Sequence, residues 1–447
     1  MARQRGTTDR RQFIKSSAAA GAGFWVAGRL HAQESDSPNE RIRFASIGVE
    51  GKGSSDSADA ASNGDMVAIC DVDEVKLGSA ARKYPNAKRY TDFRKMLEEM
   101  GDQIDAVTVS TPDHTHAPAA VMAMNLGMHC FCQKPLTHSI WEARQMAKVA
   151  KEKNVATQMG NQGTAGPGLR QAAATIRKGT LGTVSEVHVW TNRPIWPQGG
   201  EQPEPKDIPG NLDWDLWLGP AKVRAYADGY HPFAWRGFWD FGTGALGDMA
   251  CHTANMAFAA LDLRNPVSVQ AETDGHNGYS YPKWSIITFE FAANDWRPGL
   301  KMVWYDGGKR PDRELLDGRN ATGSGSIVIG DKGKLYSPDD YGERYQLLGD
   351  IEQPEVEFER APRGRSAHFA EWVRAIKGGK PAMSNFPDYS GALTETVLLG
   401  NLAVWATGDS GESDKIEWDA ENLKAKNMPE LDAIIRPEYR EGYSLEA

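Results

Sequence analysis

The sequence predicts an α/β protein with two domains, a parallel sheet in the first and a mostly antiparallel sheet in an α+β second domain. Three observations predict this class. The chain has 447 residues, which suits two domains of ordinary size. Short apolar runs alternate with helix-length segments up to about residue 160, as in parallel sheets with right-handed crossovers. Beyond that point the strand-like runs follow one another without regular helices between them.

Residues 1–32 have the character of an export signal. Arg10 and Arg11 precede an Ala/Gly-rich apolar run, and residues 30–32 resemble a cleavage site of small residues. The apolar run has 13 residues between its flanking charges, too few to span a bilayer. Paired arginines are typical of the twin-arginine route, which carries folded proteins, so we expect a periplasmic or otherwise exported protein. An ordinary secretory signal and a retained anchor are the alternatives.

A polar linker at 33–40 leads into the first domain, which we place at 41–160. Its elements are expected to alternate along the chain. Strands are expected at 42–47, 66–71, 106–110, 129–132 and 156–159, and helices from about Ser54 and at 93–99, 117–125 and 139–153.

The second domain is expected at 161–447. Its strand-like runs lie at 185–191, 284–291, 301–305 and 326–329. A long Pro/Gly/Trp-rich loop at 194–215 is of the kind that often carries function. A late helix at 389–406 is expected to pack back on one of the domains.

Charge and cysteine content narrow the possible partners. The formal charge is −9, and it becomes −14 without residues 1–32, so a nucleic-acid partner is excluded. No segment after the signal is apolar enough to span a membrane.

The four cysteines have no spacing typical of a disulfide framework or a zinc site, and we expect them to be free and buried. His114 and His116 lack a convincing third ligand, so no metal is expected.

The turn after the first strand has the composition of a dinucleotide-binding loop. Gly48 and Gly53 fit the outer positions of the G-x-G-x-x-G pattern, while Glu50 takes the middle position and Gly51 is an extra glycine. Glycines at a strand–helix junction let the backbone approach a pyrophosphate. A glycine-rich turn without a ligand is the alternative interpretation.

Asp71 strengthens the cofactor hypothesis. It follows the second strand 18 residues after Gly53, where an acidic residue bonds the ribose hydroxyls of NAD and repels the extra phosphate of NADP. No arginine stands beside it, so NAD is expected over NADP. Thr111 and Pro112 follow the third expected strand and should form the next wall of the crevice, and His116 should border the nicotinamide pocket.

Four motifs in order resemble the Gfo/Idh/MocA oxidoreductase family, which includes sugar and inositol dehydrogenases. In chain order they begin at Ser110 (Ser-Thr-Pro-Asp-His-Thr-His), Phe131 (Phe-Cys-Gln-Lys-Pro), Gly160 (Gly-Asn-Gln) and Gly247 (Gly-Asp-Met-Ala-Cys-His). The resemblance implies a Rossmann domain followed by an α/β domain whose open sheet carries the substrate site and often the oligomer contact. We therefore expect a homo-oligomer.

The resemblance also implies roles for particular residues. His252 would accept the hydroxyl proton, Asp248 would bind a substrate hydroxyl, and Lys134 would polarise the reacting oxygen. Gln133 and Gln162 would join the cofactor site, although the family's Glu-Lys-Pro is Gln-Lys-Pro here. The chemistry fits, because alcohol oxidation needs a hydride acceptor and a base. An Asp/His pair four residues apart also stabilises a helix without any catalytic role.

Tryptophans are frequent in the segment between the motif that contains Lys134 and the motif that contains His252. Arg193 and Trp196, and then Trp235 and Arg236, resemble the walls of a sugar pocket, in which rings stack on sugar faces and arginines bond hydroxyls. A tryptophan-rich core is an equally good interpretation of any one of them.

The leading functional prediction is a periplasmic NAD-dependent oxidoreductase that acts on a hydroxyl of a sugar or glycoside. Because NAD is not expected outside the cytoplasmic membrane, the cofactor should be loaded before export and stay tightly bound. A redox-neutral NAD-dependent glycoside hydrolase or lyase is the second possibility. A non-catalytic sugar-binding protein is the third, favoured by Glu50 and Gln133.

Overall fold

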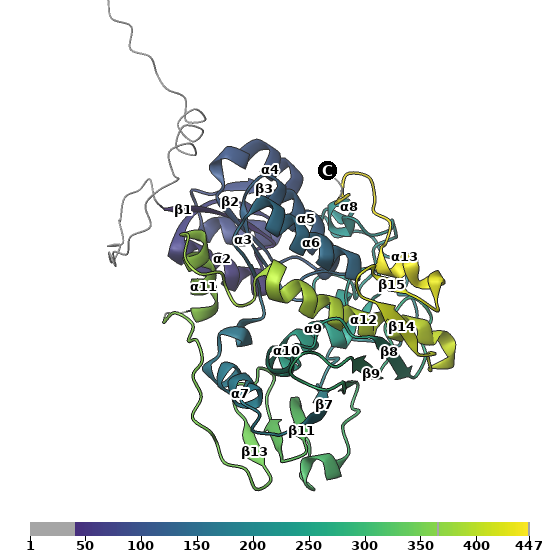
Figure 1. The fold of residues 1–447 in the computed structure, drawn as a ribbon. Helices are drawn as coiled ribbons and strands as arrows, with labels where there is room; N and C mark the ends of the chain where they lie inside the picture. Colours follow the sequence, from purple (N-terminus) through teal and green to yellow (C-terminus); the bar gives the residue numbers. More distant parts are fainter. Residues whose placement is uncertain (1–40, 364–365, 446–447) are drawn as a thin grey trace, which may run out of the picture. The chain divides into compact units, whose positions relative to one another are not determined.

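The computed structural model describes residues 41–363 and 366–445, so the signal and linker predicted at 1–40 lie outside the described residues. From Ile42 onward the chain forms a parallel sheet followed by a mostly antiparallel one (Figure 1). The predicted fold class is therefore confirmed. None of the helices within 41–363 and 366–445 has both the length and the apolar character needed to cross a bilayer.

The first sheet has six parallel strands in the order β3-β2-β1-β4-β5-β6. The strand order reverses between β1 and β4, and ligands of open α/β sheets bind beyond the carboxyl ends of the strands at such a point. The strands are β1 (Ile42–Ile47), β2 (Gly64–Cys70), β3 (Lys88–Tyr90), β4 (Ala106–Val109), β5 (His129–Cys132) and β6 (Thr157–Met159). The helices are α2 (Lys52–Asn63), α3 (Glu74–Lys83), α4 (Phe93–Met100), α5 (Asp113–Asn125) and α6 (Ile140–Lys153).

Two elements of this domain escaped the sequence analysis. Strand β3 has only three residues, Lys-Arg-Tyr, and lies at the edge of the sheet. Its charged side chains are exposed, as is usual for an edge strand, so the sequence shows no apolar pattern there. Helix α3 begins after Asp73, whose carboxylate accepts hydrogen bonds from the N–H groups of Val75 and Lys76. The strand predicted at 106–110 as the third along the chain is therefore the fourth, β4, because β3 precedes it.

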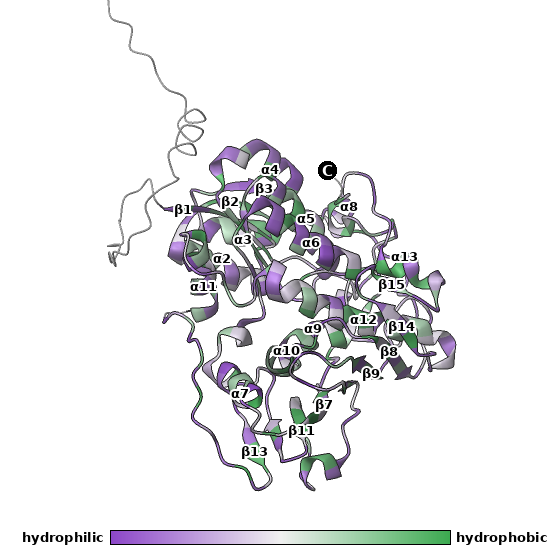
Figure 2. Cartoon of the chain, in the orientation of Figure 1, coloured by the Kyte–Doolittle hydropathy of each residue, from purple (hydrophilic) through white to green (hydrophobic). Residues whose placement is uncertain are grey.

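Local signals explain where the other helices begin. Asp92 caps α4, whose buried apolar residues alternate with charged ones (Figure 2). Ser139 and Glu142 form a reciprocal capping box at the start of α6. These caps satisfy N–H groups that would otherwise have no partner in the first helical turn.

The second sheet has nine strands in the order β13-β12-β11-β7-β10-β9-β8-β14-β15. Strands β7 and β10 are parallel, and the other neighbours are antiparallel. The strands are β7 (Val184–Trp190), β8 (Ser268–Thr273), β9 (Ser285–Phe291), β10 (Leu300–Tyr305), β11 (Gly325–Gly330), β12 (Lys334–Ser337), β13 (Gln346–Leu348), β14 (Ile416–Asp419) and β15 (Lys424–Ala425).

The remaining α-helices of the described residues lie between Pro167 and Ile435. The α-helices are α7 (Pro167–Arg177), α8 (Trp214–Leu218), α9 (Gly244–Thr253), α10 (Asn255–Leu261), α11 (Ala367–Ile376), α12 (Gly391–Thr407) and α13 (Asp432–Ile435). Short 3₁₀ turns lie at Gly101–Gln103, Gln162–Ala165, Ala234–Gly237, Arg313–Leu316, Gly408–Ser410 and Pro429–Leu431, and a π-turn lies at Phe386–Ser390.

Two late helices pack on the first domain. Helix α12, expected at 389–406, contacts α6 of the first domain as well as α9 and β8 of the second (Figure 1). In α11, Phe369 and Trp372 pack on Phe44 of β1 and Phe131 of β5. A separate apolar cluster includes Ala45 of β1, Val187 of β7 and Leu246 of α9, so the core is continuous across the two sheets.

Candidate functional site

The turn after β1 keeps its backbone free of side chains. Gly48 has φ of 78°, and a Cβ there would lie 2.6 Å from the carbonyl oxygen of Ser110. A Cβ on Gly53 would lie 2.1 Å from the carbonyl oxygen of Gly48, so only glycine allows α2 to begin this close to β1. Gly51 has nothing within 4 Å of its Cβ position, and no side chain caps α2. The turn therefore presents backbone without side chains at the N-terminus of α2, which is the requirement of a dinucleotide site.

Asp71 directly follows β2 and lines the same cavity as the glycine turn. Its carboxylate accepts hydrogen bonds from the N–H groups of Val49, at 3.1 Å, and Asp73, at 3.0 Å, which fix its orientation. Burial raises the pKa of Asp71, and these two backbone hydrogen bonds oppose that effect. Lys76 of α3 lines the same cavity, a cation that the sequence analysis did not consider. These residues fit NAD, because Asp71 still has lone pairs for two ribose hydroxyls.

The glutamine at position 133, where the family has glutamate, contacts a buried carboxylate. Its amide Nε2 donates to Asp56 Oδ2 at 2.8 Å, and the hydroxyl of Ser110 donates to the same oxygen at 2.8 Å. Lys52 forms an ion pair with the other oxygen of Asp56, a side chain that is only 1% exposed. A glutamate at position 133 would place two carboxylates in contact, so the glutamine suits this chain. Asp56 has no motif around it, and sequence analysis missed it.

Lys134 and Asp248 form the centre of the site. Lys134 Nζ donates to Asp248 Oδ1 at 2.6 Å and to the backbone carbonyl of Asp248 at 2.8 Å. Asp248 Oδ1 also lies 3.2 Å from Arg236 Nε, and Oδ2 lies 3.6 Å from Arg193 Nε. Burial opposes ionisation of Asp248, but the charges of Lys134 and Arg236 outweigh it and lower the pKa to about 2. Asp248 is therefore an anion shared by three cations.

His252 follows Asp248 by one turn of α9, as the spacing predicted. It is 4% exposed, and burial, with the nearby Lys134 charge adding to it, lowers its pKa to about 3. Nδ1 is fully buried, and neither ring nitrogen has a hydrogen-bond partner among the residues that the structure describes. The ring of Tyr341 packs against it edge-on, with centroids 5.1 Å apart. His252 is thus a neutral imidazole at physiological pH.

One cavity of about 500 Å³ brings most of the predicted site residues together. The predicted residues that line it are Gly48, Glu50, Gly51, Asp71, Thr111, Pro112, Gln133, Lys134, Gln162, Arg193, Trp196, Trp235, Arg236, Asp248 and His252. Gly53 does not line the cavity, but the absence of a side chain there lets the start of α2 lie close to the carbonyl of Gly48. The roles of the lining residues stay predictions.

His116 is placed elsewhere than expected. It is 1% exposed, and its ring nitrogens lie 2.8 Å from the carbonyl oxygen of Pro135 and 2.9 Å from that of Thr111. Its side chain does not line the cavity; it joins the two loops that carry Thr111 and Lys134. The predicted contact of His116 with the cofactor stays a prediction, and this placement does not support it. No group of three potential metal ligands occurs within residues 41–363 and 366–445.

Several lining residues were not found from the sequence. Tyr341 and Asp340 come from the loop after β12, and the amide of Gln162 lies 3.4 Å from the Tyr341 hydroxyl. No motif surrounds them, and only tertiary folding brings that loop to α9. Trp190 and Trp214, two other tryptophans of the Trp-rich segment, are buried in apolar clusters.

The segment 211–231 folds across the cofactor end of the cavity. Its backbone pairs with that of 72–74, through Glu74 N–H to Asn211 O at 2.9 Å and Asp213 N–H to Val72 O at 3.0 Å. Asn211 Nδ2 donates to Asp73 Oδ1 at 2.8 Å. His231 Nε2 lies 3.0 Å from the other oxygen of Asp73. Trp217 and His231 of this segment line the cavity, so it covers the side on which Asp71 lies.

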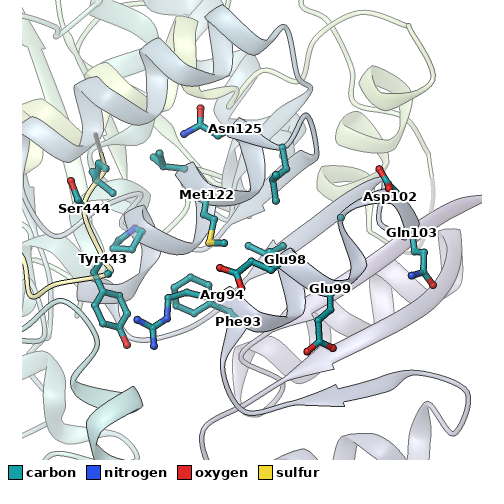
Figure 3. A pocket seen from close by; sticks show the side chains of 17 residues that line it. Phe93, Arg94, Glu98, Glu99, Asp102, Gln103, Met122, Asn125, Tyr443 and Ser444 are labelled. Carbon is teal, nitrogen blue, oxygen red and sulfur yellow. The ribbon is translucent and has the colours of Figure 1, made fainter. Parts of the chain in front are cut away.

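A second cavity, of about 520 Å³, lies between α4, α5 and the C-terminal segment (Figure 3). Its labelled side chains include Arg94, Glu98 and Tyr443, and Arg94 packs over the ring of Tyr443 at 4.3 Å. The residues that line it include none of the Lys134–Asp248 cluster and none of the glycine turn after β1. The chemistry is therefore assigned to the first cavity.

The fold and the site define a dinucleotide-binding oxidoreductase. Residues 42–161 match the profile described as "Oxidoreductase family, NAD-binding Rossmann fold", and 174–444 match "Oxidoreductase family, C-terminal alpha/beta domain". The chain belongs to the Gfo/Idh/MocA oxidoreductase family. The first domain is thus an NAD-binding Rossmann domain, which confirms the predicted cofactor.

Similar proteins include several dehydrogenases. A levoglucosan dehydrogenase of Pseudarthrobacter phenanthrenivorans is 26% identical over 190 residues, 42% of this chain and 40% of that protein. A D-glucoside 3-dehydrogenase of Escherichia coli is 32% identical over 88 residues, 20% of this chain and 24% of that protein. The WlbA dehydrogenase of Bordetella pertussis, solved with NADH and UDP-GlcNAcA, is 17% identical with a TM-score of 0.60, over 85% of this chain and 99% of that one. The structural likeness shows a shared fold.

Proposed function

We propose that the protein oxidises a secondary hydroxyl group of a sugar or glycoside and that NAD is preferred over NADP. The observation that supports this is the position of Lys134, Asp248 and His252 in the same cavity as the glycine turn and Asp71. The sugar dehydrogenases among the relatives are consistent with such a substrate. Bound NAD would supply the hydride acceptor, held by the turn at 48–53 and by Asp71.

The chain's own residues provide the remaining functions. Lys134 uses two of its three ammonium protons on Asp248, so the third can donate a hydrogen bond to the reacting oxygen. Asp248 stays ionised and accepts a hydrogen bond from a substrate hydroxyl. His252 is neutral, and its ring is free to take the hydroxyl proton.

The direct test is to add a panel of sugars and glycosides to the purified protein and to follow NADH absorbance together with the sugar products. A keto-sugar formed with reduction of NAD supports the proposal. Absence of any oxidised product across the panel, with folded protein and NAD present, would favour the non-catalytic binding protein.

We also propose that the cofactor stays bound through many turnovers. The segment 211–231 supports this, because its hydrogen bonds to 72–74 hold it beside Asp71, where it lines the cavity. Slow release is the usual route to tight binding. The protein, purified without nucleotide and then denatured, should release close to one NAD(H) per chain. Much less than that, with turnover dependent on added NAD, would contradict the proposal.

The same segment favours a second candidate function. A cofactor that cannot exchange must be reset on the protein, either by a second substrate or by a redox-neutral cycle that cleaves a glycoside. Released aglycone without net NADH, in the same product assay, would identify that hydrolase or lyase.

Export by the twin-arginine route remains a proposal that rests on Arg10 and Arg11. The four cysteines support it, because all are free and buried, as expected of a protein folded in a reducing compartment. Replacing both arginines by lysine should retain the protein in the cytoplasm, which cell fractionation measures. The expected homo-oligomer is tested by light scattering of the purified protein.

A further inference from the structure

The substrate end of the cavity carries more positive than negative charge. Lys134, Arg193 and Arg236 all meet Asp248, and Asp340 lines the cavity with these four residues. His252 is neutral because burial holds its pKa at about 3. The three cations exceed the two carboxylates by one positive charge. A bound sugar would displace water from this space, and charges shielded from water in proteins are normally paired.

The two arginines keep their hydrogen-bonding capacity for a ligand. The atom of each that lies closest to Asp248 is Nε, at 3.2 Å for Arg236 and 3.6 Å for Arg193, and neither guanidinium donates a hydrogen bond to Asp248 within the part of the chain that the structure describes. Within the described ranges, Arg236 Nη1 and Nη2 donate to no protein group, and Arg193 donates only from Nη1, to the neutral amide of Asn192. Their side chains are 22% and 23% exposed, and both line the cavity. Binding of Asp248 alone would not require these unused nitrogens.

The position of Arg236 is fixed by an aromatic ring. Its guanidinium carbon lies 4.2 Å from the centroid of Trp235, which holds the planar group against the wall of the cavity. A planar guanidinium in a fixed orientation matches the two oxygens of a carboxylate. The two arginines reach different oxygens of Asp248, and both side chains line the same cavity.

We propose that the substrate of this site is a sugar acid, whose carboxylate binds between Arg193 and Arg236 while a hydroxyl of the same sugar lies at Lys134 and His252. The proposal rests on the proposed function and narrows its substrate class. A carboxylate carries one negative charge, which equals the excess at this end, whereas a phosphate monoester carries nearly two. A neutral sugar would leave the excess charge unpaired.

The test compares sugars that differ only at C6. Methyl glycosides of glucose, galactose and mannose are each paired with the corresponding methyl uronide and 6-phosphate. Binding to the NAD-loaded protein is measured by calorimetry, and turnover by product analysis. We expect at least one uronide to bind about 10-fold or more tightly than its neutral partner, since hydrogen bonds to charged groups are the stronger ones. Equal or tighter binding of the neutral sugars, tightest binding of the 6-phosphates, or no binding of any uronide would each overturn the proposal.

Variants then locate the carboxylate. Arg236→Gln and Arg193→Gln should each lower the ratio of uronide to neutral affinity by about 10-fold, the effect of losing a charged donor. Arg319→Gln removes an arginine outside this cavity and serves as the matched control. Near-UV circular dichroism checks folding, and a variant that fails to fold leaves the other variant and the wild-type sugar pairs as the test. A wild-type ratio in both folded variants would overturn the assignment of the two arginines.

The two proposals fail in different ways. Selective uronide binding without any oxidised or cleaved product would refute the oxidation and support the sugar-acid site. Oxidation of neutral sugars without preference for uronides would support the oxidation and refute the sugar-acid site.

Discussion

The low pKa of His252 leads to a prediction that distinguishes a neutral base from an ordinary histidine. His252→Gln removes the imidazole and keeps a polar side chain of similar reach. If His252 accepts the proton, this change should lower turnover about 100-fold or more, the usual contribution of a positioned acid or base. The wild-type rate should also show no ionisation of His252 near pH 6.5, because the ring is already neutral there.

The magnitude follows from the burial of the ring. Lowering a pKa from 6.5 to about 3 disfavours the protonated form by about 5 kcal/mol, of which burial is the largest cause and the Lys134 charge the next. A folded-state pKa below the unfolded value means that the unfolded chain binds the proton first. The stability contributed by neutral His252 is thus complete above about pH 6.5 and is lost as the pH falls toward 3. At pH 5 the loss amounts to about 2 kcal/mol.

Two assays measure this. The ratio kcat/KM is recorded from pH 4 to 8 with the best substrate. Unfolding midpoints of wild type and His252→Gln are recorded at pH 7 and pH 5. We expect no step in kcat/KM from His252 above about pH 4, and we expect the wild type to lose stability between pH 7 and pH 5 relative to the variant. Lys134, Asp248, His368 and Lys52 contribute to the potential at His252 and are present in both proteins.

Two results would refute the reasoning. One is an acid limb of kcat/KM near pH 6.5 that disappears in His252→Gln, because the ring would then titrate normally. The other is a parallel loss of stability in the two proteins between pH 7 and pH 5, because burial would then not oppose protonation of His252.

Three further predictions concern neighbouring residues. Lys134→Ala should lower turnover about 100-fold or more with unchanged circular dichroism, since the donor to the reacting oxygen is lost; near-wild-type rates would remove Lys134 from the mechanism. Asp71→Ala should raise the use of NADP relative to NAD, because Lys76 remains beside the ribose to meet a phosphate; an unchanged ratio of kcat/KM would show that Asp71 is not at the ribose. Gly53→Ala should lower the melting temperature and the NAD content, because its Cβ would meet a backbone oxygen at 2.1 Å, while Gly78→Ala in α3, with no neighbour within 4 Å, should not; equal behaviour of the two variants would contradict the close approach.

The sequence was sufficient for the fold class and for much of the site. The strands β1, β2, β4 and β5 contain apolar runs, and their alternation with helices permits few topologies. The glycine turn and Asp71 could be placed because their function depends on local spacing along one strand–helix–strand unit. Asp248 and His252 could be related because four residues make one helical turn. In each case the chemistry depends on residues that are close in the sequence.

Tertiary structure decided what depends on residues far apart in the sequence. The sequence gives no signal that Asp56 lies under Gln133, that Tyr341 packs on His252, or that segment 211–231 covers the cofactor end. His116 shows the converse, since its motif placed it in the site while the fold places its ring between two backbone carbonyls. The charge at the substrate end was also undetermined, because it depends on Arg193 and Arg236 meeting Asp248 from separate loops. Local spacing follows from backbone geometry, whereas burial, and with it the pKa of His252 and the pairing of charges, follows only from how distant elements pack.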